Sequence, residues 1–117
     1  MVIHQGDVLF VDFGPPKGSA PGYWRPAAVV QDDRFNQSKI NTLVVVAMTS
    51  NLKFQHSPGN ARLRRGEANL DVETVANVTQ IATIDRSQVL RKIGTLSTQR
   101  TRQIIAGIGA VLGADML

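Results

Sequence analysis

The sequence predicts a mainly β protein with one C-terminal helix, arranged as a small, strongly curved barrel or half-barrel. Short segments rich in β-branched and apolar residues fill most of the chain, and the only convincing helical pattern follows residue 97. Many short strands followed by one late helix favour such a barrel over a sheet of alternating strands and helices. The 117 residues leave room for a single domain, residues 1–117.

The first half of the chain contains three predicted strands. The segment 7–13 is rich in β-branched and aromatic residues and stops at the Gly-Pro-Pro of residues 14–16. A loop rich in glycine and proline follows, and Pro26 then opens the strand 27–31, at a position where a strand tolerates proline. The apolar segment 42–48 is typical of a central strand that is buried on both faces.

The second half contains shorter elements. Residues 61–64 alternate between apolar and polar and predict a short, half-exposed strand. Residues 74–78 and 81–84 form either one long strand or two short ones, and residues 93–96 are compatible with a last short strand. Asp85 is expected to cap a single helical turn.

The predicted helix runs from Thr98 to about Leu112, with Ser97 as its N-cap. Its apolar residues fall on one helical face: Ile104, Ile105, Ile108, Val111 and Leu112. Two glycines inside the helix each lower its intrinsic stability by up to about 1 kcal/mol relative to alanine. We therefore expect packing of the apolar face against the sheet to hold the helix.

The composition excludes several classes of site. The chain contains no cysteine, which removes disulfides, zinc–thiolate sites, iron–sulfur clusters and a cysteine nucleophile. No spacing of side chains indicates a metal site, and no glycine-rich phosphate loop precedes a helix, so we expect neither metal nor cofactor. The sequence shows neither a membrane-spanning run nor a signal peptide, and a soluble cytoplasmic protein is expected.

Basic residues gather in two parts of the chain, which has a net charge of +4. Residues 86–102 contain five Lys or Arg and no acid, and a second cluster consists of Arg62, Arg64 and Arg65. Such clusters suit phosphate groups, because each contact releases counterions from a nucleic acid. A solvated basic face that keeps the domain soluble is an equally good interpretation.

The two histidines, His4 and His56, are far apart in the sequence, and no carboxylate is spaced to act with either. A two-histidine ribonuclease arrangement is open on the sequence alone, although His4 is more typical of a surface residue. His56 follows the predicted central strand, where it could reach a ligand; a surface position is the alternative.

Arg25 lies directly before Pro26, at the entrance of the second strand. A residue before proline is restricted to extended backbone, and the glycine-rich loop above Arg25 would let a ligand approach closely. Its guanidinium offers a rigid fork of donors suited to phosphate, although a structural salt bridge is an equal alternative. Trp24 offers either a stacking face for an unpaired base or a side chain that fills the core.

The central strand ends in Thr49, Ser50 and an asparagine. Strand ends that border loops commonly carry function, and ordinary strand termination is the alternative. Gln80 lies in an apolar region and needs hydrogen-bond partners for its amide, which a shared cleft would supply.

The chain resembles the MazF/PemK (Kid) toxins, the sequence-specific mRNA interferases of type II toxin–antitoxin modules, in six motifs that follow one another along the sequence. The motifs are Gly6-Asp7-Val8, Gly18-Ser19 with residues 25–30, Asp33 with Asn36, Thr49-Ser50, residues 80–86, and residues 94–97. The similarity covers residues 5 to 113. Any one motif is weak, but six at the right spacings are specific.

The resemblance implies an SH3-like β-barrel with a C-terminal helix, the fold also found in the CcdB toxins. It implies a homodimer that is neutralised by a MazE-like antitoxin with an acidic, partly disordered tail. It further implies metal-independent cleavage of single-stranded RNA. The 2′-hydroxyl would attack the adjacent phosphorus and leave a 2′,3′-cyclic phosphate and a 5′-hydroxyl.

Carried over by position, the family's catalytic arginine falls on Arg25 and its catalytic threonine on Thr49. The guanidinium would stabilise charge that develops on the phosphate oxygens, because such stabilisation acts more on the transition state than on the ground state. The candidate RNA-binding residues are Ser19, Trp24, Ser50, His56 and Gln80. One position departs from the family, which commonly has a glutamate where this chain has Ala20.

Two other functions stay open on the sequence. A CcdB-like poison of DNA gyrase would act without catalysis and would need no pairing of Arg25 with Thr49. The C-terminal residues 113–117 lack a terminal aromatic anchor, which argues against it. A catalytically weak barrel that only binds RNA or antitoxin is the second alternative, because Ala20 replaces the usual carboxylate.

Overall fold

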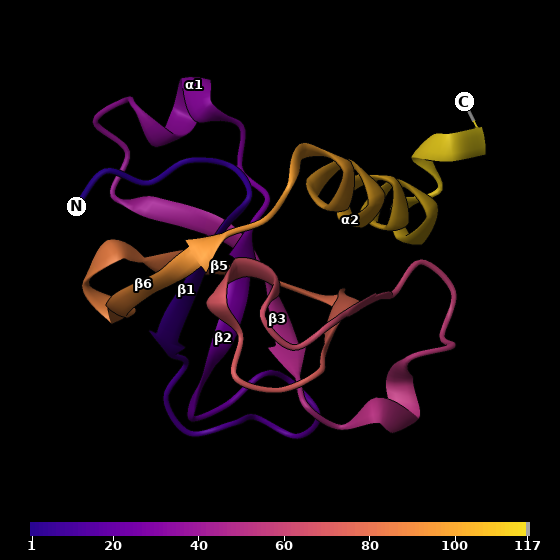
Figure 1. The fold of residues 1–117 in the computed structure, drawn as a ribbon. Helices are drawn as coiled ribbons and strands as arrows, with labels where there is room; N and C mark the ends of the chain where they lie inside the picture. The colour runs from indigo at the N-terminus through magenta and orange to yellow at the C-terminus, as the bar shows by residue number, and fades with distance from the viewer. Residues whose placement is uncertain (117) are drawn as a thin grey trace.

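The structure is a computed structural model that describes residues 1–116 (Figure 1). Six strands form one antiparallel sheet: β1 (Asp7–Asp12), β2 (Trp24–Val29), β3 (Thr42–Thr49), β4 (Ala61–Leu63), β5 (Thr74–Asp85) and β6 (Val89–Thr95). Their order in the sheet is β4-β5-β3-β2-β1-β6. The helical elements are α1 (Asp33–Asn36), α2 (Thr98–Leu112) and the short 3-10 turns η1 (Leu52–Phe54), η2 (Glu67–Asn69), η3 (Arg86–Gln88) and η4 (Ala114–Met116).

The sheet curls until its β6 edge meets the turn η2, so the predicted small, curved β-barrel with a C-terminal helix is confirmed (Figure 1). The amide of Asn69 donates a hydrogen bond to the carbonyl oxygen of Ile93 over 3.1 Å. Gly94 lies so close to Ala68 that a Cβ at this glycine would overlap the Ala68 carbonyl group. Side-chain and backbone contacts, instead of a strand ladder, therefore close the barrel.

Both faces of the central strands are buried, because successive side chains of a strand point to opposite faces of a sheet. In β3, Val45 and Val46 are both fully buried, which confirms the prediction for this segment. One core cluster contains Val8, Ala28, Val46, Met48, Leu63, Val78 and Ile104. The other contains Ile3, Leu9, Val11, Ala27, Val29, Leu43, Val45 and Ile84.

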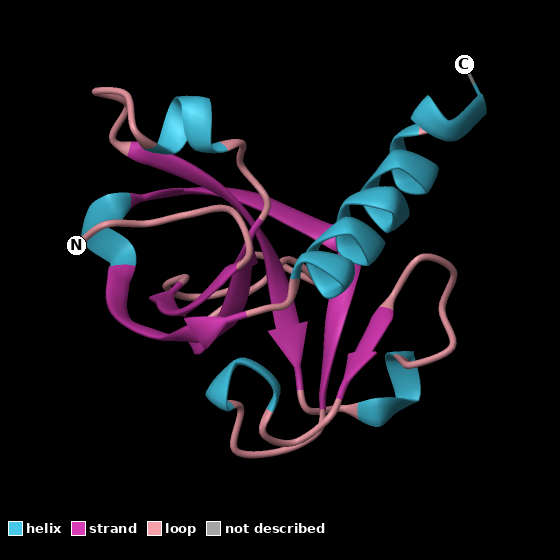
Figure 2. Cartoon of the chain, turned by 45° about the horizontal axis from the view of Figure 1, so that its top comes forward, coloured by secondary structure: helices cyan, strands magenta, loops and turns pink. Residues whose placement is uncertain are grey.

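Helix α2 begins as predicted, since the hydroxyl of Ser97 accepts a hydrogen bond from the backbone N–H of Arg100. Only part of its apolar face packs against the barrel. Ile104 is buried, but Val111 is 41% exposed and Leu112 is 69% exposed. Figure 2 shows why: the C-terminal end of α2 projects beyond the strands. The expected packing against the sheet therefore holds the helix through Ile104, while the C-terminal part of its apolar face is left uncovered.

Other differences from the predicted elements are local. Residues 74–84 belong to one long strand, β5, and the last strand begins at Val89 instead of residue 93. The short helix α1 was not predicted, because it lies in a polar stretch without a periodic pattern. Asp85 caps η3 as expected. Within residues 1–116 no helix is both long and apolar enough to cross a membrane.

An ion pair fastens the start of α2 to the barrel. The guanidinium of Arg100 donates from Nε to Oε1 of Glu67 over 2.9 Å and from Nη2 to Oε2 over 3.1 Å. The backbone N–H of Arg64 donates to the same carboxylate. These hydrogen bonds, chiefly those from Arg100, hold the pKa of Glu67 below its usual range.

Acid is expected to remove this contribution to stability. A carboxyl group whose pKa is lowered by folding stabilises the fold above its unfolded pKa, and the effect disappears as the pH falls through the folded value. We expect Glu67→Gln to lower the free energy of unfolding by about 1 kcal/mol at neutral pH. The gap should close between about pH 5 and pH 3. Urea denaturation at several pH values measures it, and a gap that is independent of pH would contradict this assignment.

Candidate active site

Strands β2 and β3 diverge at one end of the sheet. They pair from Val29–Val45 to Ala27–Ala47, and beyond that point β2 pairs only with β1 while β3 pairs only with β5. Arg25 and Thr49 lie two residues beyond this last pair, each on one of the separated strands. The divergence leaves an opening between them, and each side of this opening is a pocket.

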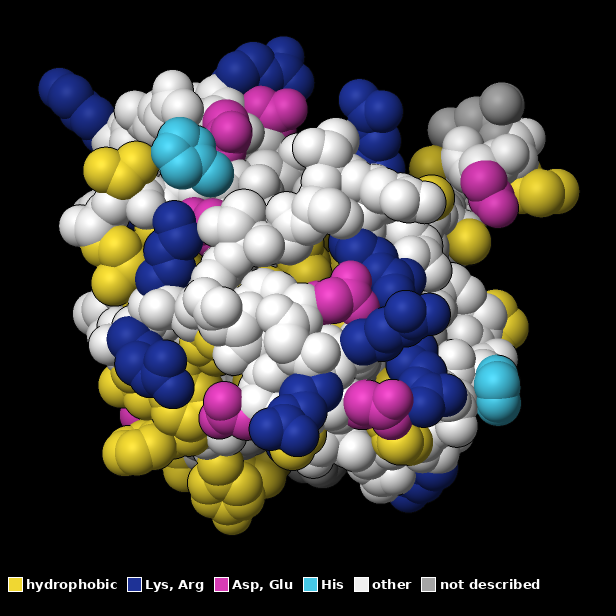
Figure 3. All heavy atoms as spheres, in the orientation of Figure 1, with side chains coloured by type: hydrophobic (Ala, Val, Ile, Leu, Met, Phe, Trp, Pro, Cys, Tyr) yellow, Lys and Arg dark blue, Asp and Glu magenta, His cyan; other side chains and the backbone are white. Residues whose placement is uncertain are grey.

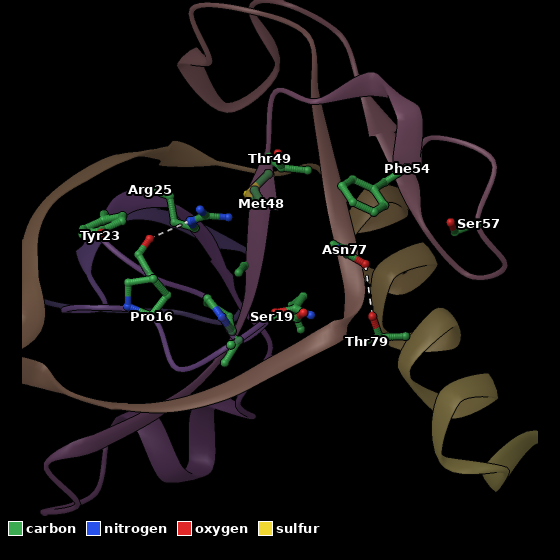
Figure 4. Close-up of a pocket in the computed structure, with 16 residues that line it drawn as sticks. Pro16, Ser19, Tyr23, Arg25, Met48, Thr49, Phe54, Ser57, Asn77 and Thr79 are labelled. Carbon is green, nitrogen blue, oxygen red and sulfur yellow. Dashed lines mark hydrogen bonds between the residues drawn. The ribbon is translucent and has the colours of Figure 1, made fainter.

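The larger pocket, called pocket A here, has a volume of about 620 Å³. Its walls come from the β1–β2 loop, the end of β3, the loop after β3 and the middle of β5. Figure 4 shows Arg25 reaching from β2 toward Met48 and Thr49, with Phe54 and Asn77 on the far side. The polar side chains that line pocket A are Ser19, Tyr23, Arg25, Thr49, Ser57, Asn77, Thr79 and Gln80.

Arg25 is the one charged side chain among the described residues that line pocket A. Its Nε donates a hydrogen bond to the carbonyl oxygen of Gly22 over 3.0 Å, which fixes the orientation of the guanidinium. No carboxylate of residues 1–116 lies within salt-bridge distance, so the structural salt bridge is excluded for this part of the chain. The two terminal nitrogens are thus available to bind a phosphate through two parallel hydrogen bonds.

Thr49 is the last residue of β3 and is half-buried. Its hydroxyl oxygen accepts a hydrogen bond from the backbone N–H of Asn51 over 3.1 Å. This leaves the hydroxyl proton available for a ligand, since a hydroxyl can donate and accept at once. Arg25 and Thr49 therefore offer three donors to one cavity.

An irregularity in β5 supplies the polar wall of pocket A. Four residues of β5, positions 77–80, lie between the pairs Val46–Ile81 and Met48–Ala76, whereas only Ala47 lies between them on β3. Such bulges re-aim side chains and are frequent beside functional sites. The carbonyl oxygen of the Asn77 side chain accepts hydrogen bonds from Asn60 and Thr79, each over 3.3 Å. Gln80 lies in the same wall.

Tyr23 lines pocket A and was not among the predicted site residues. Its φ of +56° lies in the left-handed region, which is unusual for a residue other than glycine. Two backbone hydrogen bonds hold it there, from the Tyr23 N–H to Gly14 and from the Phe13 N–H to Tyr23. Strained backbone of this kind is concentrated at functional sites. No sequence signal identifies it. Asn77 and Thr79 were not predicted either, because they reach the pocket through the irregularity of β5, which no local pattern marks.

The smaller pocket on the other side of the opening, called pocket B here, has a volume of about 300 Å³. Arg25 and Thr49 line it as well as pocket A. Trp24 and Ser50 line pocket B and not pocket A. Trp24 is 64% exposed, so it does not fill the core.

The histidines lie elsewhere. His56 is exposed on the loop after β3 and lines neither pocket, and Nδ1 of His4 lies 3.5 Å from Asp33. The two histidine side chains are on opposite sides of the molecule in Figure 3, so the two-histidine ribonuclease arrangement is wrong. Among residues 1–116, no three His, Cys, Asp or Glu side chains are grouped to hold a metal ion.

A family model for the PemK-like, MazF-like toxins of type II toxin–antitoxin systems matches residues 4–112. The chain belongs to this toxin family. The resemblance seen in the six motifs is thereby confirmed for nearly the whole chain.

Relatives of the MazF-like chain agree with this assignment. Endoribonuclease MazF6 of Mycobacterium tuberculosis is 32% identical over 112 residues, which cover 96% of this chain and 98% of the relative. The crystal structure of MazF from Deinococcus radiodurans superimposes with a TM-score of 0.80 at 23% identity, over 97% of this chain and 98% of that chain. A mycobacterial endoribonuclease in complex with its cognate antitoxin gives 0.77 at 16% identity, over 95% of each chain. The structural matches show that the fold is that of MazF toxins.

Proposed function

We propose that this toxin is a metal-independent endoribonuclease that cuts single-stranded messenger RNA at a short recognition sequence and so inhibits translation. Endoribonuclease activity follows from the family and from relatives that carry this name. The observation that supports the mechanism is the convergence of Arg25 and Thr49 on one cavity, with both terminal nitrogens of the guanidinium available. A phosphate that bridges two nucleotides fits this set of donors.

In the proposed reaction, the ribose 2′-oxygen attacks the adjacent phosphorus. A bond from O2′ to phosphorus forms, the bond from phosphorus to O5′ breaks, and the products end in a 2′,3′-cyclic phosphate and a 5′-hydroxyl. Negative charge builds up on the non-bridging oxygens, where Arg25 donates its hydrogen bonds and Thr49 orients the group. Because this stabilisation is stronger in the transition state than in the bound substrate, it accelerates the step.

Proton transfer does not need a carboxylate of pocket A. Its described lining contains no acidic side chain and no histidine, and Ala20 occupies the position where the family commonly has glutamate. Arginine stays protonated at any ordinary pH, so Arg25 is an electrostatic clamp and not the base. Water then accepts the 2′-hydroxyl proton, and a second water gives a proton to the departing 5′-oxygen, so we expect slower turnover than in a relative with the glutamate.

The remaining polar residues of the two pockets would hold the RNA strand. Ser19 and Gln80 face the strand in pocket A, while Ser50 and Trp24 face it in pocket B. His56 lies outside both pockets and has no role in this proposal.

Two protein partners belong to the same proposal. Related MazF toxins have been solved with MazE, and we propose that a MazE-like antitoxin neutralises this chain in the cytoplasm. Apolar side chains that the barrel leaves uncovered support a protein interface, including that of a homodimer. They include Phe35 on α1 and Ile105, Val111 and Leu112 on α2.

The gyrase-poison alternative is not favoured, because the relatives are endoribonucleases. The deciding experiment incubates the purified protein with long single-stranded RNA in excess EDTA. We expect cuts at defined sites, with 5′-hydroxyl ends that a polynucleotide kinase can label directly. RNA that stays intact, or is cut only after Mg²⁺ is added, would contradict the proposal. Intact RNA together with gyrase-dependent DNA breaks would indicate the poison, and inactivity in both assays would indicate a binding barrel.

A further inference from the structure

Pocket B continues into a third cavity along the line where the barrel closes. This cavity has a volume of about 280 Å³ and shares Pro26, Val72 and Thr74 with pocket B. Its other lining residues come from β1, β6, the end of η2 and the segment after η2: Phe10, Asn69, Leu70, Asp71, Arg91 and Ile93. Pocket B and this cavity together are called the seam groove here.

Aromatic and cationic side chains are stacked along the seam groove. The rings of Trp24 and Phe10 meet edge to face, with centroids 6.3 Å apart. The guanidinium of Arg91 lies over the ring of Phe10, 5.5 Å from its centroid. Within the described chain Arg91 has no ion-pair partner, and it is exposed. In Figure 3, exposed hydrophobic side chains gather at the lower left with Lys or Arg beside them.

Strand alternation places the seam groove on the opposite face of the sheet from pocket A. Phe10 pairs with Pro26 and Val11 pairs with Arg25, so neighbouring pairs face opposite ways. Trp24 lies two residues before Pro26 on β2, so both side chains point to the same face of the sheet as Phe10. Pocket A and pocket B meet where β2 and β3 have separated, and Arg25 and Thr49 line both of them. A phosphate at these two residues therefore has one neighbouring nucleotide on each face.

The lining of the seam groove suits a base better than a second phosphate. The carboxylate of Asp71 would repel a phosphate, whereas it can accept hydrogen bonds from the amino group of a base. The exposed ring of Trp24 and the guanidinium of Arg91 are the side chains on which unpaired bases stack.

We propose that the seam groove binds one unpaired nucleobase, next to the phosphate held by Arg25 and Thr49, by stacking on Trp24. The inference rests on the proposed function, because it assigns RNA to the adjoining pocket. It makes the seam groove a determinant of the recognition sequence on one side of the cut and pocket A the determinant on the other.

Trp24 is the only tryptophan of the chain, so intrinsic fluorescence reports on the groove directly. The probe is a pool of single-stranded 2′-O-methyl oligonucleotides of random sequence, which lack the attacking hydroxyl. We expect quenching of the tryptophan emission upon binding. Anisotropy of the end-labelled pool should show about tenfold weaker binding to Trp24→Ala, and Trp24→Phe should restore most of the loss. Ile40→Ala is the control, because Ile40 is an exposed hydrophobic residue that lines neither the groove nor pocket A and has no role in the proposed interface.

A second readout keeps this inference separate from the proposed function. Trp24→Ala should relax the sequence preference on one side of the cut, while Ile40→Ala should leave the preference unchanged. If the wild type cuts RNA but bound oligonucleotide leaves the tryptophan emission unchanged, and if Trp24→Ala keeps the wild-type preference, the base site is wrong and the nuclease stands. If the emission is quenched but RNA is not cut, the base site stands and the nuclease is wrong. Circular dichroism checks that each variant is folded.

Discussion

Replacing Arg25 with alanine is expected to slow RNA cleavage by a factor of about 10² to 10³. The guanidinium is the one charged group in the described lining of pocket A, and no other side chain there can take over its charge. Arg25→Lys should recover only a small part of the rate, because an ammonium group cannot form two parallel hydrogen bonds with a phosphate. Thr49→Val should have a smaller effect of about tenfold, the loss of a single hydrogen bond.

Initial rates on one RNA in excess EDTA measure these effects. Arg34→Ala is the matched control: it removes the same charge from an exposed position on α1 that lines neither pocket A nor pocket B and where Arg34 pairs with Asp32. We expect its rate to stay close to that of the wild type. A rate for Arg25→Ala within about threefold of the wild type would show that the arginine does not stabilise the transition state.

Replacing Gly107 with alanine is expected to destabilise the fold by about 1–3 kcal/mol. A Cβ at this position would overlap the carbonyl oxygen of Gly59 and press on the side chain of Val78. The loop before β4 rests directly on α2 at this point, and its backbone cannot move away without losing its contact with β5. The same loop carries Asn60, whose amide bonds to Phe54 and Asn77 in the wall of pocket A.

Gly109 provides the matched control in the same helix. Nothing lies within 4 Å of a Cβ built at Gly109. Gly109→Ala should therefore stabilise the protein by up to about 1 kcal/mol, the gain in helix propensity. Urea denaturation of both variants gives the comparison. If both variants change the free energy of unfolding equally and in the same direction, helix propensity alone determines the effect. The close approach of Gly59 to Gly107 would then not constrain position 107.

Much of the fold follows from local sequence patterns. The strands that cross the core are continuous apolar runs, and the caps at Ser97 and Asp85 have recognisable residue types. Local sequence features also made Arg25 and Thr49 candidate site residues. Arg25 stands directly before a proline, and Thr49 follows a continuous apolar strand. Their motifs, taken together in order, carried the resemblance to the toxin family.

The features that the sequence did not predict depend on the pairing register of the strands and on the curvature of the sheet. Asn77 and Thr79 reach pocket A only because β5 is irregular opposite Ala47, and no local pattern gives the position of that irregularity. The choice between an exposed and a buried Trp24 depends on where β2 separates from β3. The exposure of Val111 and Leu112 depends on how far α2 extends past the sheet, which helical periodicity does not report.

The closing line of the barrel has an energetic consequence. Because β6 and η2 meet through a few contacts and one hydrogen bond from an amide side chain, without a strand ladder, this line is joined more weakly than the paired strands of the sheet. The seam groove lies along the same line, so a base bound in the groove would contact residues of β6 and of the segment at η2 together. A ligand that binds the closed groove and not the opened one would therefore stabilise the folded barrel, and the occupancy of the groove would be thermodynamically linked to global stability.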